Sequence, residues 1–162
     1  MSALLFISAA IYVVYIVMMC AMFGVPESIS DTCYLLERRK KGRGKLFMFF
    51  LWAVVFTLCP HWFDASPDNI RFLVFFAASG LLLTGAAHRF KEHEATIHFA
   101  GAMTSVVATM LWLIFAKLSI FIPVVPLFLL GAIFKRNTYI FWSENGAFVA
   151  LFSALIYLQI IN

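Results

Sequence analysis

The stretch Pro26–Lys45, PESISDTCYLLERRKKGRGK, is the one long polar interruption in an otherwise apolar chain. It contains six of the twelve Lys and Arg residues, which are Arg38, Arg39, Lys40, Lys41, Arg43 and Lys45. Positive charge in a short loop marks the cytoplasmic side of a membrane, so this stretch sets the sidedness of every later segment. We expect these side chains to bind anionic lipid headgroups, and recognition of a specific partner is the alternative.

Composition places the chain among polytopic membrane proteins. Of its 162 residues, 64% are hydrophobic and 12% are charged, whereas a soluble domain is about half apolar and about a quarter charged. No polar stretch is long enough for a soluble domain, so we expect a single transmembrane domain over residues 1–162. The net charge of +4 lies mostly in short loops, so it does not indicate nucleic-acid binding. The three cysteines lack the spacing of a disulfide framework or a zinc ribbon.

Charge-poor runs of about 20 residues predict an all-α bundle of about six transmembrane helices. The predicted spans are 3–23, 46–63, 70–87, 96–116, 118–134 and 139–160. The fifth span carries Pro123 and Pro126, which predict a kinked or broken helix. A re-entrant hairpin there would reduce the count to five. Ten of the twelve basic residues fall in loops on one side, which predicts external termini and a cytoplasmic loop 24–45. Helical spans favour the bacterial inner membrane.

The polar stretch has the pattern of a short interfacial helix. Ser28 and Asp31 form the S-x-x-D start of a helix. The following DTCYLLERRKK predicts a helix that ends near Gly42. We expect its apolar residues to face the lipid or the bundle while its basic end meets phosphates.

Two ionisable residues lie inside predicted spans, where charge is costly and often functional. Glu144 lies near the start of the last span and His98 lies just inside the fourth, both at the cytoplasmic end. One hypothesis has them facing each other across a polar interior that includes Ser105. In the alternative, Glu144 is interfacial and pairs with Lys135 or Arg136.

Small residues at helical spacing predict close packing between spans. They include Gly80, Thr84, Gly101, Ser105 and Ala147. We expect hydroxyl groups on the first span to make structural hydrogen bonds inside the bundle, and these belong to Ser8, Tyr12 and Tyr15. Trp62 is expected to be an anchor at the membrane interface.

Three regularly spaced histidines raise the question of a metal site. His88, His93 and His98 are five residues apart, which rotates each by about 140° on a helix, so they cannot share one face. A zinc site would need a break between them and ligands from other spans. We therefore expect loop histidines in a solvated turn and no cofactor, with zinc as the alternative.

Three motifs carry a resemblance over nearly the whole chain. They are PESISDTCY after the first span, GAAHRFKEHEATIHFAGA between the third and fourth, and FWSENGAF at the start of the last. The chain resembles an uncharacterised family of small multipass proteins of Bacteroidota and their phages. This resemblance gives no indication of a particular activity. The chain is more faintly similar to ceramidase-like membrane hydrolases, which combine Ser, Asp and His residues around zinc. Those have seven spans and an HxxxH pair, which this chain lacks.

Because no catalytic motif appears, a non-enzymatic function is favoured. We expect an oligomeric channel, pore or membrane-perturbing effector, with a ring of Glu144 or His98 lining the pore. A metal-dependent lipid hydrolase is one alternative, with catalytic candidates Asp31, His98 and Glu144 beside His88 and His93; zinc would activate water there. A scaffold that binds a partner through residues 26–45 is the other.

Overall fold

The computed structural model describes residues 2–133 and 136–161, and within these every regular element is helical. Five helices are long and apolar enough to cross a membrane. They are α1 (Ser2–Phe23), α3 (Lys45–Ala65), α5 (Glu94–Phe115), α7 (Tyr139–Ile161), and α4 (Arg71–Ala86) together with the flanking turns η1 (Asp68–Ile70) and η2 (Ala87–Arg89). The all-helical fold is therefore confirmed, and five of the predicted spans coincide with helices long and apolar enough to cross a membrane.

The predicted span 118–134 is a broken segment rather than one long helix. It contains η4 (Ser119–Phe121), α6 (Val124–Leu129) and η5 (Leu130–Ile133). Pro123 caps α6 and Pro126 lies in its first turn, where the missing N–H costs least. The break that the prolines predict is thus confirmed within the described residues. Residue 134 lies outside them.

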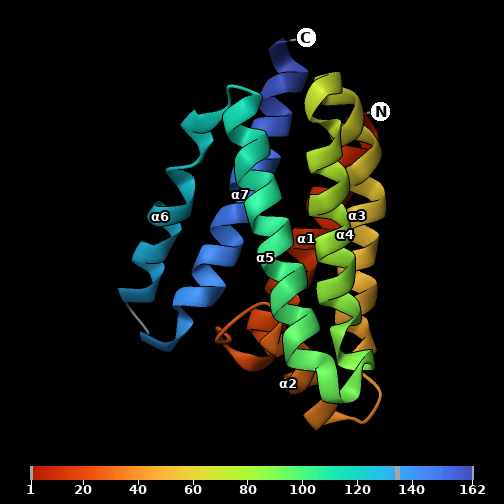
Figure 1. The fold of residues 1–162 in the computed structure, drawn as a ribbon. Coiled ribbons are helices and arrows are strands. Elements are labelled where there is room, and N and C mark those ends of the chain that lie inside the picture. The colour runs from red at the N-terminus through yellow and green to blue at the C-terminus, as the bar shows by residue number, and fades with distance from the viewer. Residues whose placement is uncertain (1, 134–135, 162) are drawn as a thin grey trace.

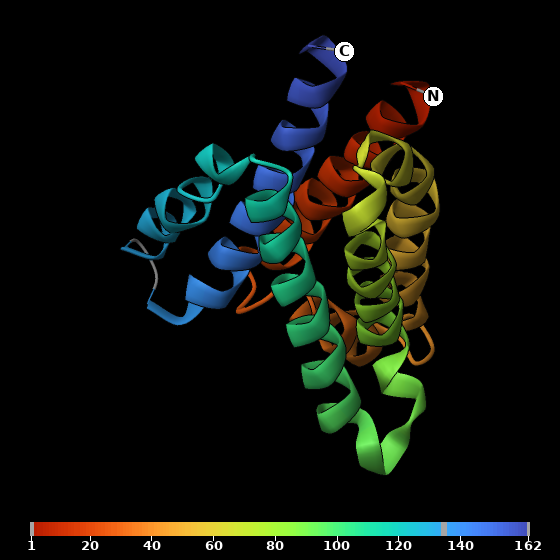
Figure 2. The same cartoon turned by 45° about the horizontal axis from the view of Figure 1, so that its top comes forward.

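The broken segment runs along α7 and ends well above the lower ends of α3, α4 and α5 (Figure 1). It starts at the end where α5 finishes and descends beside α7, and α6 packs against α7 (Figure 1). Figure 2 shows α6 outside α7 and remote from α3 and α4. Glycines make the α6–α7 contact close, because a Cβ at Gly146 would lie 2.9 Å from Val125 Cα. Both chain termini lie at the same end of the bundle (Figure 1).

The predicted interfacial helix is α2 (Asp31–Arg39), at the other end of the bundle (Figure 1). The Ser28 hydroxyl accepts a hydrogen bond from the Asp31 N–H at 3.0 Å, as the S-x-x-D pattern predicts. The helix ends at Arg39, before the predicted stop at Gly42. Its buried face consists of Thr32, Cys33 and Leu36, whereas Tyr34 is exposed.

A carboxylate holds the turn that follows α2. Glu37 accepts hydrogen bonds from the N–H groups of Gly42 at 2.8 Å and Gly44 at 3.0 Å. Gly42 has φ +87°, a left-handed conformation that glycine adopts without strain. The six basic residues of this region are all exposed.

The closest helix contact joins α4 and α5 through the predicted small residues. A Cβ at Gly80 would lie 2.5 Å from the Gly101 carbonyl oxygen, and one at Gly101 would lie 2.8 Å from the Gly80 carbonyl oxygen. Backbone therefore meets backbone, an approach that only glycine permits. The prediction of close packing at these positions is confirmed.

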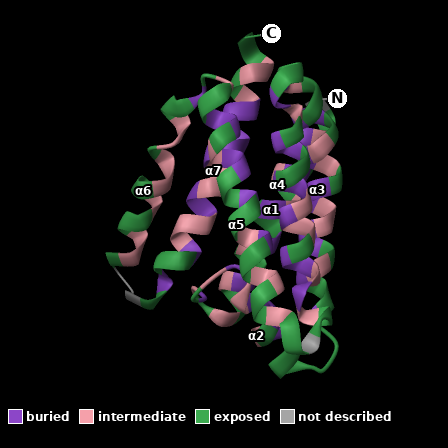
Figure 3. Cartoon of the chain, in the orientation of Figure 1, coloured by how far each residue is buried: buried purple, intermediate pink, exposed green. Residues whose placement is uncertain are grey.

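Figure 3 shows buried residues on the inner parts of the long helices and exposed residues on their outer parts. Many of the exposed residues are large and apolar, among them Phe6, Val14, Phe56 and Phe99. Such an apolar exterior suits hydrocarbon as the surrounding solvent. The expectation for Trp62 is wrong, because this side chain is only 1% exposed. Its ring instead meets the ring of Trp112 on α5 edge-on, at 5.4 Å between ring centroids.

Candidate functional site

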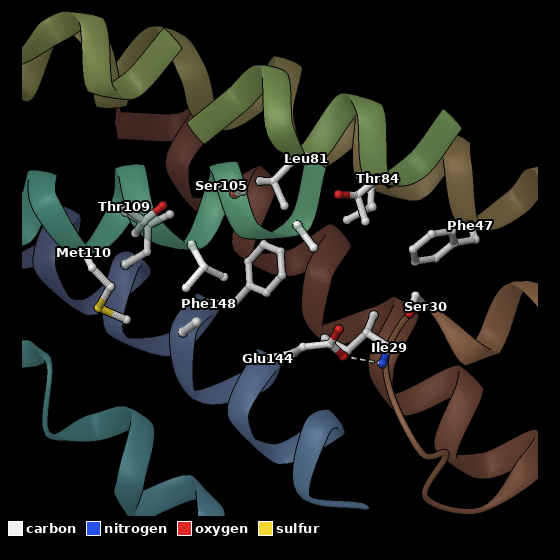
Figure 4. A pocket seen from close by; sticks show the side chains of 15 residues that line it. Ile29, Ser30, Phe47, Leu81, Thr84, Ser105, Thr109, Met110, Glu144 and Phe148 are labelled. Atoms are coloured by element: carbon white, nitrogen blue, oxygen red, sulfur yellow. Dashed lines mark hydrogen bonds between the residues drawn. The ribbon is translucent and has the colours of Figure 1, made fainter. Parts of the chain in front are cut away.

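The loop of residues 24–30 folds back against the start of α7 and forms one wall of the site. The Phe141 N–H donates to the Glu27 carbonyl at 3.0 Å. The Ile29 N–H donates to Glu144 Oε2 at 2.5 Å (Figure 4). Gly24, with φ +73°, lets the chain turn sharply after α1. The carboxyl group of Glu144 thus binds a backbone amide of a distant loop.

Hydroxyl groups of α1 form hydrogen bonds to three other elements inside the bundle. Tyr12 donates to Asn145 Oδ1 at 2.7 Å, and the Tyr15 and Thr32 hydroxyls lie 2.6 Å apart. Ser8 donates to the Val54 carbonyl at 3.0 Å. The predicted structural role of these hydroxyls is confirmed.

An apolar chamber of about 90 Å³ lies among α3, α4, α5 and α7 (Figure 4). Its lining includes Phe47, Leu51, Ala102, Val106, Met110, Ala147, Phe148 and Leu151. Thr84, Ser105 and Thr109 add hydroxyl groups, and Glu144 is the one charged residue of the lining. The helices α5 and α7 contact each other through few residues, which leaves space between them for the chamber.

A polar chamber of about 220 Å³ adjoins it at the end of the bundle covered by α2. Three carboxylates line it, from Glu27, Asp31 and Glu94, together with the imidazoles of His88 and His98. The two chambers share Ser30, Phe47 and Thr84 as wall residues. The two chambers are therefore neighbours, and together they are called here the two-chamber groove, with one mainly apolar chamber and one that carries the polar side chains.

Tyr34 links α2 to α5 at the polar chamber. Its hydroxyl donates to Glu94 Oε1 at 2.6 Å. The ring of Tyr34 is largely exposed, but partial desolvation, the hydrogen bond and the negative charge of Glu94 together raise its pKa to about 12. Burial also raises the pKa of Cys33 to about 11. Both groups therefore stay protonated at neutral pH, so Tyr34 serves as a donor and Cys33 is a poor nucleophile.

The predicted site residues are only partly brought together. Asp31, His88 and His98 line the polar chamber, whereas Glu144 and Ser105 line the apolar one. Glu144 hydrogen-bonds Ile29, and His98 contacts the Thr84 backbone, so the two do not pair with each other.

The sequence offers Lys135 and Arg136 as alternative partners of Glu144. Lys135 lies outside the described residues, and the side chain of Arg136 is likewise not described.

The three histidines do not converge on one point. His93 ends the short η3 helix (Lys91–His93) and is absent from the lining of the groove. In the described part of the chain, no three His, Cys, Asp or Glu side chains are arranged to hold a metal ion.

Two features of the site escaped sequence reasoning. Asn145, which is 6% exposed, bonds both Tyr12 and the Phe141 carbonyl. Its signal was present, because Ser143-Glu144-Asn145 is a polar triplet inside an apolar helix. The sequence gives no indication that the Ile29 N–H is the donor to Glu144, because every residue except proline has a backbone N–H.

Comparison of the chain with protein-family models, curated proteins and solved structures finds no match. The resemblances noted from the sequence therefore stay predictions.

Proposed function

We propose that this protein binds a membrane amphiphile in the two-chamber groove, with the methylene groups next to its head in the apolar chamber and the head itself in the polar chamber. One observation supports this most directly: the two chambers share wall residues, so polar and apolar linings adjoin. An amphiphile has the same division. A binding site for a fully water-soluble molecule would gain little from the apolar chamber.

The placement of the groove supports a ligand taken from the bilayer. The apolar chamber lies among helices that are long enough to cross a membrane. The polar chamber lies beside α2, where headgroups would meet an interfacial helix.

The topology that accompanies this function has six crossings, with residues 119–133 as the broken sixth. An even number of crossings returns the chain to the side on which it began, which agrees with the position of both termini at one end of the bundle (Figure 1). We place the basic loop and the polar chamber on the cytoplasmic side of a bacterial inner membrane, with external termini. Single cysteines at Lys41 and Asp64 should then label from the cytoplasm and from outside, respectively. The reverse labelling pattern would overturn this orientation.

Filling the apolar chamber tests the proposed function. In Ala147→Phe, the larger side chain should occupy the space of an acyl chain and strongly reduce the lipid that co-purifies with the protein. Val107→Phe is the matched control, because Val107 lies on the outer surface of α5 with 49% exposure. Mass spectrometry of extracted lipid and binding of a single-chain probe give the two readings. Equal lipid content in both variants would contradict the proposal.

A lipid hydrolase is the second candidate, because Asp31, His88 and His98 line one chamber. Metal analysis of protein purified after zinc supplementation tests it, and one zinc per chain would favour it.

The oligomeric pore stays a prediction. Native mass spectrometry tests it, since a closed ring of several subunits would support a pore. The exposed basic residues near α2 are proposed to bind anionic headgroups, and the scaffold alternative predicts instead a protein that co-purifies through them.

A further inference from the structure

We infer that the groove selects an acyl lipid, whose carbonyl oxygen accepts hydrogen bonds from the hydroxyl groups of Ser105 and Thr109. The inference rests on the proposed amphiphile binding and specifies the chemistry of the ligand. The two residues are four positions apart on α5, so their side chains leave the helix on the same face. Both line the apolar chamber (Figure 4).

These two hydroxyl groups are buried and have no hydrogen-bond partner among the described residues. Ser105 is 5% exposed and Thr109 is 7% exposed. Hydroxyls in the other long helices do have partners, since Thr57 and Thr84 each donate to a carbonyl in the preceding turn of their own helix, at 2.7 Å and 2.8 Å. A buried hydroxyl without a partner is costly. The pair on α5 therefore points to an acceptor that a ligand supplies.

The two hydroxyl oxygens open into the chamber rather than into packed protein. Among the described residues, the unpartnered polar atoms that are fully enclosed belong to other side chains, for example His61 Nε2 and Trp62 Nε1. The oxygens of Ser105 and Thr109 are not among these enclosed atoms, so they keep accessible surface. Because both side chains form part of the chamber wall, a ligand in the chamber can reach that surface.

The depth of the hydroxyl groups matches the acyl linkage of a lipid. Thr84 lines both chambers and so marks their border. The residue that faces Thr84 across the close α4–α5 contact is Gly101. Ser105 follows Gly101 by four residues, so it lies about 6 Å further into the apolar chamber. An acyl carbonyl stands between the head and the hydrocarbon of a lipid, so a head in the polar chamber places the carbonyl near this level.

A carbonyl oxygen suits two neighbouring donors. It has two lone pairs and no donor of its own, so it can accept from both hydroxyl groups and leave nothing unpaired. A saturated chain offers no acceptor, and an ether oxygen is a weaker acceptor than a carbonyl. An acyl ester could also arrive as a small water-soluble molecule, so the test includes a short ester.

The test uses the full-length protein in dodecyl maltoside micelles, which carry no acyl carbonyl, and native mass spectrometry counts the bound adducts. The probes are the ester dodecanoylglycerol, the ether dodecylglycerol and the short ester glycerol monoacetate. We expect the dodecyl ester to bind about tenfold more tightly than the ether, the ratio expected for two neutral hydrogen bonds. Glycerol monoacetate should bind weakly, because it has no chain to fill the apolar chamber.

Two variants each remove one donor with little change in volume. Ser105→Ala and Thr109→Val should each weaken the ester about threefold and leave the ether unchanged, and the double variant should lose the preference for the ester. Neither should lower the melting temperature of the ligand-free protein, because each removes a buried hydroxyl that lacks a partner. Thr57→Val is the matched control, since its hydroxyl donates within its own helix.

The outcomes separate this inference from the proposed function. Equal binding of ester and ether would overturn the acyl carbonyl and leave amphiphile binding intact. Lower melting temperatures in both variants, with the ester preference retained, would assign the hydroxyls a structural role and also overturn it. Glycerol monoacetate as strong as dodecanoylglycerol would overturn a lipid source. If neither dodecyl probe bound and Ala147→Phe left the lipid content unchanged, the proposed function itself would fail.

Discussion

Glu144 Oε2 accepts a hydrogen bond from the Ile29 N–H at 2.5 Å, across 115 residues of sequence. A carboxylate of α7 therefore holds the loop that follows α1. The same loop lines both chambers, through Ile29 and Ser30. An ionisable residue inside an apolar helix thus has a structural partner at the border of the groove.

Removal of this acceptor should destabilise the bundle. Glu144→Ala leaves the buried Ile29 N–H without a partner, which costs about 1–3 kcal/mol. Glu144→Gln keeps a carbonyl acceptor and should retain most of the stability. Thermal unfolding in detergent measures both, with Ser143→Ala as the control because its hydroxyl bonds only within its own helix turn. If Glu144→Ala melted like Ser143→Ala, the bond would not be important for stability.

The glycine contact between α4 and α5 should be sensitive to a single methyl group. Gly101→Ala places a Cβ 2.8 Å from a backbone carbonyl, so the helices must separate, at a cost of about 1–3 kcal/mol. In the control Gly85→Ala, the nearest atom is Leu51 Cβ at 3.3 Å, so the neighbour needs to shift by only a few tenths of an ångström. A lower melting temperature for Gly101→Ala than for Gly85→Ala is expected, and the opposite order would refute the backbone contact.

The loop after α2 should loosen in acid. Hydrogen bonds from Gly42 and Gly44 hold the pKa of Glu37 below its ordinary value. A depressed folded-state pKa means that the stabilising effect is present above the unfolded pKa and is lost as pH falls through the folded pKa. Hydrogen exchange of the loop amides, corrected for intrinsic rates, should show this loss. Glu37→Gln should be poorly protected throughout, and equal pH dependence in both proteins would contradict the carboxylate clamp.

The buried Tyr12 hydroxyl should contribute about 1 kcal/mol to stability through its bond with Asn145. Tyr12→Phe removes the donor and keeps the ring, which packs against Phe148 at 4.6 Å between centroids. Tyr157→Phe is the control, since Tyr157 is 46% exposed. The measured quantity is the difference in melting temperature between the two variants. A larger effect at Tyr157 would show that the hydrogen bond to Asn145 adds little.

Several parts of the site were accessible from sequence because they depend on local pattern. Gly80 and Gly101 stand out as small residues at helical spacing, and Tyr12 and Tyr15 as hydroxyls in an apolar run. The partner of Glu144 was not accessible, because the prediction considered only side chains while the actual donor is a backbone N–H. The prediction for Trp62 was wrong because sequence position alone does not separate two environments. An aromatic residue near the end of a helix can lie at the membrane interface or pack against another helix.

The sequence by itself determined the helices, since runs of apolar residues long enough for a bilayer have few other solutions, and the prolines determined where one of them breaks. Only the tertiary structure decided which residues meet. The loop of residues 24–30 lies against α7, and α5 stands apart from α7 enough to leave a chamber. Hydropathy is a sum over neighbours along the chain, whereas a groove depends on distances between segments that the chain order does not encode.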